Sequence, residues 1–161
     1  MSEKYVVLIG PPNSGKTTFF NKVTGKNSKV VNYPGSTVDI SIGKSLFHKD
    51  IIFLDTPGLF SLKPQSDDEK VSCKTLMELN TVTTANSKYP DLIFSFIDMN
   101  QPSRHLLLTK QLIRNGYPVV VFLTMQDQVK KNKVTFNVAD FEKQLGVKVF
   151  DIDFLKLKSM D

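Results

Sequence analysis

The chain has 161 residues, of which 40% are hydrophobic, and a formal net charge of +5. This length suits one domain that can bury roughly 70% of its unfolded surface. The single cysteine excludes an internal disulfide framework, and no apolar run approaches the roughly 18 residues of a membrane-spanning helix. The amino terminus leads directly into an apolar strand instead of a signal peptide, so the expected location is cytoplasmic. The scattered lysines favour a solvated basic surface, with nucleic acid and an acidic lipid surface as lesser alternatives.

Apolar runs alternate with helical patterns along the chain, which is typical of a parallel sheet with crossover helices. The first strand is expected over residues 4–9, followed by a loop and a helix over residues 16–24 that Gly25 can end. Two strands over residues 37–44 and 51–55 are joined by a short turn and predict one antiparallel edge strand. The later expected elements are strands over residues 91–98, 118–124 and 147–152, and helices over residues 102–116 and 138–146.

These elements predict a single α/β domain over residues 1–161, with a mostly parallel six-stranded sheet and helices on both faces. Residues 26–36 and 58–88 fit no regular element well and are expected to be moving loops, the second with an internal helix. Both histidines, His48 and His105, are expected at the surface without a metal role. The core face of the helix over residues 102–116 is expected to comprise Leu106, Leu107, Leu112 and Ile113.

The stretch "IGPPNSGKTT" carries the pattern G-x-x-x-x-G-K-S/T between an expected strand and an expected helix. In that context the backbone N–H groups at the start of the helix can bind the α- and β-phosphates of a nucleotide. The Lys16 ammonium can reach the β- and γ-phosphate oxygens, and the Thr17 hydroxyl can ligate Mg²⁺. The predicted residues of this phosphate loop are Gly10, Pro11, Pro12, Asn13, Ser14, Gly15, Lys16, Thr17 and Thr18.

A second motif, "FLDTPG", ends the expected strand over residues 51–55. Asp55 can contact Mg²⁺ through water, and the Gly58 N–H can meet a γ-phosphate and release it after hydrolysis. Thr56 and Pro57 lie between them and are counted with the site. The motif follows the phosphate loop by roughly 40 residues, which is the arrangement of a nucleotide switch.

The stretch "NYPGSTVDI" lies between these two motifs and offers a further hydroxyl ligand. Thr37 is the preferred second hydroxyl ligand to Mg²⁺, and the neighbouring Ser36 remains an alternative. Gly35 precedes them in the same loop. These residues are therefore expected to close over the nucleotide from the first moving segment.

The stretch "FLTMQDQ" follows the expected fifth strand, where a base-recognition element belongs. The Asp127 carboxylate can accept hydrogen bonds from both N1–H and N2–H₂ of guanine, a pairing that adenine would oppose. Thr124 stands where an asparagine usually ties this strand to the phosphate loop, and its side chain is shorter. Met125 and Gln126 complete the element. Guanine is therefore predicted as the base, and the shorter Thr124 side chain is expected to weaken its binding.

In order and spacing, these motifs resemble the amino-terminal GTPase domain of ferrous iron transport protein B (FeoB). The likeness covers residues 4–152 and includes "NYPGSTVD", "DTPGLFSL", "PSRHLLLTKQL" and "TMQD". It implies a P-loop small-GTPase fold that binds GTP or GDP with Mg²⁺ and hydrolyses GTP slowly. It also implies stimulation by K⁺, since Asn13 stands where such GTPases hold a monovalent cation. The catalytic residues it implies are Asn13, Lys16, Thr37 and Gly58, and Leu59 replaces the water-orienting glutamine of Ras-like proteins.

The chain departs from this family pattern at three places. Thr124 replaces the usual asparagine, and Asp153 and Phe154 stand where a Ser-Ala loop is expected over the guanine. The sequence given also stops at Asp161, before the closing helix, the helical regulatory domain and the membrane permease of the family. The expectation is weaker nucleotide binding, iron transport that depends on a membrane permease outside this sequence, and, as part of a FeoB transporter, a location of this domain at the cytosolic face of the inner membrane.

Two other readings compete with a GTP-hydrolysing switch. A degenerate GTPase-like interaction module would keep the fold and weak nucleotide binding but little turnover. An ATP-using P-loop kinase would need a lid and an acceptor site, and the "TMQD" element argues against it.

Overall fold

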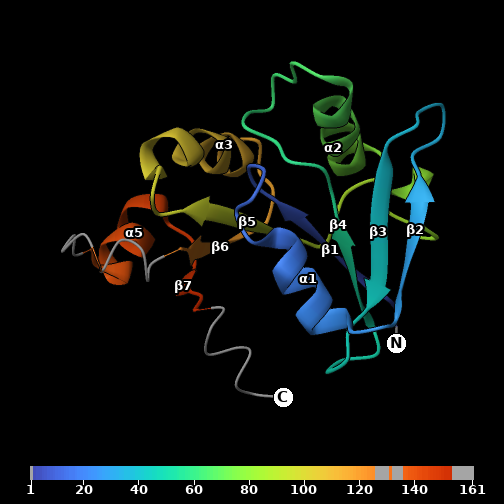
Figure 1. Ribbon diagram of the computed structural model, residues 1–161, viewed down its shortest axis with the longest axis horizontal. Helices are drawn as coiled ribbons and strands as arrows, with labels where there is room; N and C mark the ends of the chain where they lie inside the picture. The colour runs from blue at the N-terminus through green and yellow to red at the C-terminus, as the bar shows by residue number, and fades with distance from the viewer. Residues whose placement is uncertain (1, 126–130, 132–135, 154–161) are drawn as a thin grey trace.

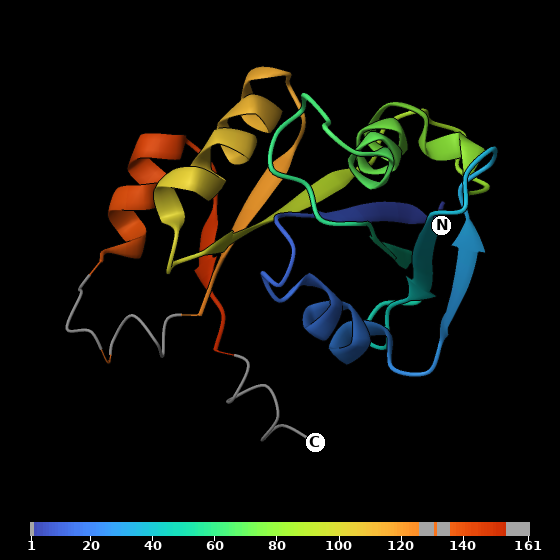
Figure 2. The same ribbon diagram turned by 45° about the horizontal axis from the view of Figure 1, so that its top comes forward.

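The computed structural model describes residues 2–125, 131 and 136–153. Its centre is a seven-stranded sheet in the order β2-β3-β4-β1-β5-β6-β7, with helices on both faces (Figures 1 and 2). The strands are β1 (Lys4–Ile9), β2 (Ser28–Asn32), β3 (Asp39–Lys44), β4 (Ile51–Asp55), β5 (Leu92–Asp98), β6 (Val119–Thr124) and β7 (Val149–Asp151). The helices are α1 (Lys16–Thr24), α2 (Asp67–Met77), the 3₁₀ turn η1 (Leu79–Thr81), α3 (Pro102–Arg114) and α5 (Val138–Leu145).

The structure confirms the predicted fold class and adds a seventh strand. β2 lies within residues 26–36, which the sequence had predicted to be an irregular moving loop. It pairs antiparallel with β3, which also runs antiparallel to β4, so the antiparallel strand lies one place inside the edge. β2 buries only Val31 in part, so its side chains carry little of the alternating pattern that reveals a strand. Backbone pairing with β3 forms it instead.

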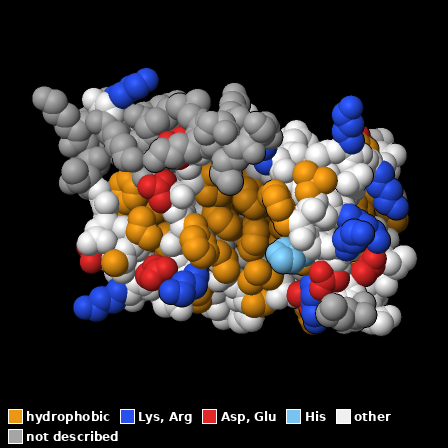
Figure 3. Space-filling model, turned by 90° about the horizontal axis from the view of Figure 1, so that it is seen from below, with side chains coloured by type: hydrophobic (Ala, Val, Ile, Leu, Met, Phe, Trp, Pro, Cys, Tyr) orange, Lys and Arg blue, Asp and Glu red, His pale blue; other side chains and the backbone are white. Residues whose placement is uncertain are grey.

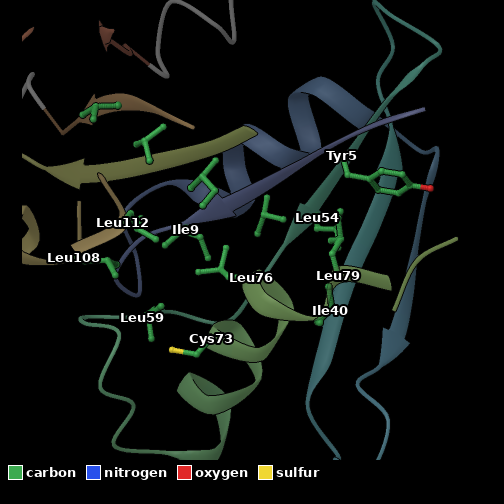
Figure 4. Packing of buried hydrophobic residues seen from close by; sticks show 14 of the residues in the cluster. Tyr5, Ile9, Ile40, Leu54, Leu59, Cys73, Leu76, Leu79, Leu108 and Leu112 are labelled. Carbon is green, nitrogen blue, oxygen red and sulfur yellow. The ribbon is translucent and has the colours of Figure 1, made fainter. Parts of the chain in front are cut away.

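The middle of the sheet is buried on both faces. Successive residues of β1 alternate between two hydrophobic clusters: Tyr5, Val7 and Ile9 join the larger one, and Val6 and Leu8 join the smaller one. The larger cluster lies under α2 and α3. In Figure 4 the side chains of Leu76 and Leu79 lie against Ile9, Ile40 and Leu54. The strand that leads into the phosphate loop is therefore held from both sides.

The smaller cluster lies between the sheet and α1. It contains Phe20 of α1 together with Phe53 and Phe96 of the sheet. Phe19, Phe94 and Phe122 pack against it in part, and Figure 3 shows a broad hydrophobic area on this side of the molecule. α1 thus buries aromatic side chains directly beneath the strands that carry the site.

The face that α3 turns to the core agrees with the predicted one in part: Leu112 is buried, and Leu106 and Ile113 pack, partly buried, against the larger cluster. His105, Leu108, Thr109 and Leu112 are buried, whereas Leu107 is 53% exposed. Two polar residues can occupy this face because β5 supplies hydrogen bonds. The Ser95 and Thr109 hydroxyls lie 2.8 Å apart, and the Asp98 N–H donates to His105 Nδ1 over 3.1 Å. His105 is therefore a core residue and not a surface one, and its burial lowers the pKa of the imidazole.

Among the helices of the described residues, none combines the length and apolar character needed to cross a bilayer.

Candidate nucleotide-binding site

The phosphate loop joins β1 to α1 and depends on two glycines. A Cβ atom at Gly10 would lie 3.0 Å from both the carbonyl oxygen and the Cβ of Phe96. Gly15, directly before α1, has φ 94°, a left-handed conformation that favours glycine. Asn13 also has a positive φ, 60°, and its side chain is exposed. The loop conformation therefore follows from the residue types in the motif.

Lys16 lies buried beneath this loop. Its ammonium donates to the carbonyl oxygens of Gly10 over 3.1 Å and Pro11 over 3.0 Å. Burial lowers the pKa of Lys16 to about 8, and the nearby Asp55 carboxylate opposes that shift. Phosphate oxygens would give this buried cation the negative charge that the two neutral carbonyls do not supply.

Asp55 and Thr17 meet at the mouth of the loop. The Thr17 hydroxyl donates to Asp55 Oδ2 over 2.7 Å. Asp55 Oδ1 is buried and has no hydrogen-bond partner within the described parts of the chain. Burial raises the pKa of Asp55, and both the Thr17 hydroxyl and Lys16 counteract it. A buried carboxylate oxygen without a partner, beside a hydroxyl, fits a hard divalent cation or its bound water.

The segment after β4 lies directly on the phosphate loop. The Leu59 N–H donates to the Gly10 carbonyl oxygen over 2.9 Å. A Cβ atom at Gly58 would collide with the Pro12 ring, so only glycine allows this approach. A hydrogen bond fixes Thr56 to β1, because its hydroxyl donates to the Leu8 carbonyl oxygen over 3.0 Å. Asp55 and Gly58 are thereby brought to the loop together, as their spacing predicted.

Helix α3 holds the same segment from its other side. The Arg104 guanidinium lies 4.3 Å from the centre of the Phe60 ring, and the His105 ring centre lies 6.4 Å from it. Gln111 Oε1 accepts a hydrogen bond from the Leu62 N–H over 2.7 Å. We call Arg104, His105 and Gln111 the α3 dock. Sequence reasoning assigned none of them to the site, although "PSRHLLLTKQL" stood out in the family resemblance.

The first moving segment is not brought to the metal-binding pair. Residues 33–38 form a turn between β2 and β3, in which the Tyr33 N–H donates to the Val38 carbonyl oxygen over 2.9 Å. The Ser36 hydroxyl accepts from the Val38 N–H over 3.0 Å, and Thr37 is exposed. Figures 1 and 2 both place this turn away from the phosphate loop. Thr37 and its alternative Ser36 therefore stay predictions as metal ligands.

At the base-recognition end, Thr124 makes the connection that its shorter side chain had put in doubt. Its hydroxyl is fully buried and lies 2.8 Å from the Ser14 carbonyl oxygen, 110 residues away in sequence. Met125 follows with φ 62°, an uncommon conformation for a residue with a side chain. Asp153 is partly buried. The remaining residues predicted at this end, Gln126, Asp127 and Phe154, lie outside the described residues.

A family model described as ferrous iron transport protein B matches residues 4–161. The Fe(2+) transporter FeoB of Legionella pneumophila is 36% identical over 153 residues, which are 92% of this chain and 19% of that protein. An Fe(2+) transport protein A/Fe(2+) transporter FeoB fusion protein of Porphyromonas gingivalis is 39% identical over 145 residues, which are 88% and 16%. The chain thus spans about a fifth of the curated relatives it matches.

Solved structures agree with this assignment. A mutant of S. thermophilus NFeoB bound to GDP superposes with a TM-score of 0.84 and 37% identity, covering 95% of this chain and 57% of that one. NFeoB from S. thermophilus bound to GDP.AlF4- and K+ gives a TM-score of 0.79 at the same identity, covering 95% and 56%. The family model and the superposed structures each match nearly the whole of this chain, so the chain belongs to the ferrous iron transport protein B family, as its amino-terminal GTPase domain.

Proposed function

We propose that this chain binds GTP and GDP and hydrolyses GTP slowly, as the nucleotide switch of a ferrous iron transporter. The observation that carries the proposal is the group formed by Lys16, Thr17, Asp55 and Gly58 at one end of the sheet. A buried cation, an unpartnered buried carboxylate oxygen and a glycine in contact with the phosphate loop meet there. The solved relatives that carry GDP, or GDP.AlF4- with K+, support the same ligand class.

The phosphate end works through charge and backbone donors. The Lys16 ammonium would turn from the Gly10 and Pro11 carbonyls toward the β- and γ-phosphate oxygens and stabilise the charge that develops on them. The Thr17 hydroxyl, the Asp55 carboxylate through water, and Thr37 would hold Mg²⁺, which would supply positive charge to the bound phosphates. The Gly58 N–H would bind the γ-phosphate, so loss of that phosphate would free the segment that follows it.

The residues of this chain explain why turnover is expected to be slow. Leu59 is fully buried, and an aliphatic side chain cannot orient water. We therefore assign no general base. K⁺, held in part by the exposed Asn13, would supply positive charge of the kind that an arginine finger supplies elsewhere.

Recognition of guanine is proposed for Asp127, with Thr124 holding the strand end against the phosphate loop. Because Thr124 contacts the Ser14 carbonyl oxygen, the position of the base-recognition strand is tied to the position of the phosphates. An Asp127→Asn variant is expected to shift the preference from guanine to xanthine, since an amide reverses one hydrogen-bond polarity.

The deciding experiment is phosphate release from GTP under single-turnover conditions, in K⁺ and in Na⁺. The wild-type chain should release phosphate faster in K⁺, Asn13→Ala should lose the difference, and Lys16→Ala should be inactive. If the wild-type chain binds fluorescent GDP but releases phosphate no faster than Lys16→Ala, the result would favour the hypothesis of an interaction module with little turnover. Competition by GTP and ATP for a fluorescent GDP analogue tests the base, and a preference for ATP would overturn the guanine assignment.

In the native protein we propose that this domain acts at the cytosolic face of the inner membrane, beside a permease that moves ferrous iron. The matched relatives are Fe(2+) transporters, and the chain aligns with about a fifth of their length. Removal of nucleotide binding by Lys16→Ala in the full-length protein should therefore slow iron uptake by cells without lowering the amount of transporter.

A further inference from the structure

The turn between β3 and β4 presents the most exposed large hydrophobic side chain recorded for the described residues. Phe47 is 74% exposed, and the adjacent Leu46 is 52% exposed. β4 starts after this turn and ends at Asp55, so the turn lies at the opposite end of the sheet from the phosphate loop (Figure 1). Nothing in the nucleotide site accounts for two neighbouring apolar side chains in solvent at that position.

Hydrogen bonds hold this turn in place. The Ser45 hydroxyl accepts from the N–H groups of Phe47 and His48, each over 3.2 Å. The Leu46 N–H donates to the Val23 carbonyl oxygen near the end of α1 over 2.8 Å. The backbone that carries the two exposed side chains is therefore fixed by the fold.

Lysines surround the same turn. A pocket of about 1010 Å³ next to it is lined by Leu46 and by Lys26, Lys29, Lys44 and Lys49. The Lys44 ammonium pairs with Glu3 over 3.0 Å. The ammonium groups of Lys26, Lys29 and Lys49 have no carboxylate partner in the described part of the chain. Glu3 lines the same pocket and Asp50 follows Lys49 in sequence, so the four lysines outnumber these two carboxylates.

We propose that this end of the domain docks on an anionic phospholipid surface. Phe47 and Leu46 would enter the boundary between headgroups and acyl chains, and the lysines would contact lipid phosphates, some of them within the pocket. We call Lys26, Lys29, Lys49, Leu46 and Phe47 the basic tip.

The combination of side chains selects this partner. A nucleic acid would interact favourably with the lysines but only weakly with an exposed leucine. An anionic bilayer would attract the lysines and also bury the apolar side chains. Docking through the basic tip would also leave the nucleotide site facing away from the lipid, open to exchange. The inference therefore stands independently of the proposed GTP hydrolysis.

Sedimentation with vesicles tests the proposal. The wild-type chain should bind vesicles of phosphatidylcholine mixed with phosphatidylglycerol, bind phosphatidylcholine alone far more weakly, and lose binding as salt is raised. Reversal of three charges, by Lys26→Glu, Lys29→Glu and Lys49→Glu together, should lower the binding constant by about a hundredfold or more. Replacement of both apolar side chains, Leu46→Ser with Phe47→Ser, should lower it by about tenfold.

Matched controls use exposed residues elsewhere on the molecule. Lys74→Glu, Lys110→Glu and Lys143→Glu together reverse three charges on α2, α3 and α5, and Leu107→Ser removes another exposed leucine. These variants should bind nearly as wild type does, apart from the general loss of net charge. Fluorescent GDP binding should be unchanged in every variant.

Three outcomes would overturn the proposal. One is equal binding to the two kinds of vesicle or to neither, which would leave an acidic protein as the partner of the lysines. Another is an equal loss of binding in the control triple and the basic-tip triple. The third is full competition by soluble glycerol phosphate, which would identify a site for a free anion in place of a lipid surface.

Discussion

At the residue scale, the decisive contact is the hydrogen bond between the Thr124 hydroxyl and the Ser14 carbonyl oxygen. From the sequence, threonine in place of asparagine predicted a weakened connection, because its side chain is shorter. The backbones of β6 and the phosphate loop come close enough for the shorter side chain to span the gap. Thr124 is fully buried, so water could not replace either group of this hydrogen bond if the other were removed.

Thr124→Val tests this contact by removing the hydroxyl while keeping the shape of the side chain. The buried Ser14 carbonyl would lose its partner at a cost of about 1–2 kcal/mol, so the affinity for GDP should fall by about tenfold. Titration with fluorescent GDP measures the effect, and Thr124→Ser, which keeps the hydroxyl, should bind within about twofold of wild type. Equal affinity in the valine variant would show that the contact does not serve nucleotide binding.

Lys16 offers a second test at this scale, through pH. Its pKa falls from 10.5 to about 8 in the fold, so the nucleotide-free fold holds a buried ammonium at a cost of about 3 kcal/mol below pH 8. That cost disappears as the pH rises from about 8 to 10.5, because the unfolded chain then binds more protons than the folded one. Wild type should therefore gain stability relative to Lys16→Met over this window.

Denaturant unfolding of both proteins between pH 7 and 10, without nucleotide, measures that difference. Parallel pH profiles for wild type and Lys16→Met would contradict a lowered pKa at Lys16.

At the element scale, α3 does more than cover the sheet. Its dock holds the segment after Gly58 through the Arg104–Phe60 contact and the Gln111–Leu62 hydrogen bond. The sequence predicted the position of this helix and, with Leu106, Leu112 and Ile113, most of its expected core face. It wrongly included Leu107, and it missed that His105 and Thr109 are buried. Hydrogen bonds from β5 allow those polar residues to be buried. The spacing of apolar residues along a helix does not show which hydrogen-bond partners a neighbouring strand supplies.

Gln111→Leu should disturb the dock without touching nucleotide. Because Leu62 would lose its acceptor, the segment that carries Gly58 should be less ordered, and kcat for GTP should fall by about fivefold to tenfold. KM for GTP and the affinity for GDP should stay within about twofold, since those interactions lie in the phosphate loop. Lys110→Ala, on the neighbouring exposed position, is the control. A rise in KM as large as the fall in kcat would instead indicate that the substitution disrupts the whole nucleotide site.

At the scale of the whole molecule, one sheet separates two functional ends. The phosphate loop and Asp55 lie at one end, and the basic tip precedes β4 at the other. The two are connected by β4 and by α1, whose nine residues span roughly 14 Å. The proposed docking and nucleotide binding could therefore occur together.

Nucleotide should stabilise the entire domain, since its ligands come from elements across the sheet. At about 100 times the dissociation constant, GDP with Mg²⁺ should add about 2.7 kcal/mol and raise Tm by about 5–10 °C. Thermal scans with GDP and with ADP measure this, and Lys16→Ala should show no rise. A similar rise with ADP would argue against guanine recognition at Asp127.

The sequence by itself determined the phosphate loop, the Asp55–Gly58 motif and most of the parallel sheet. Those features depend on local requirements: glycines at Gly10 and Gly15, a hydroxyl after Lys16, and apolar runs of strand length. Only the tertiary structure decided that Thr124 reaches Ser14, that Arg104 lies over Phe60 and that β2 joins the edge of the sheet. The first two contacts join residues that are far apart in the chain, and β2 pairs through its backbone without a recognisable side-chain pattern. All three therefore depend on how the folded elements pack.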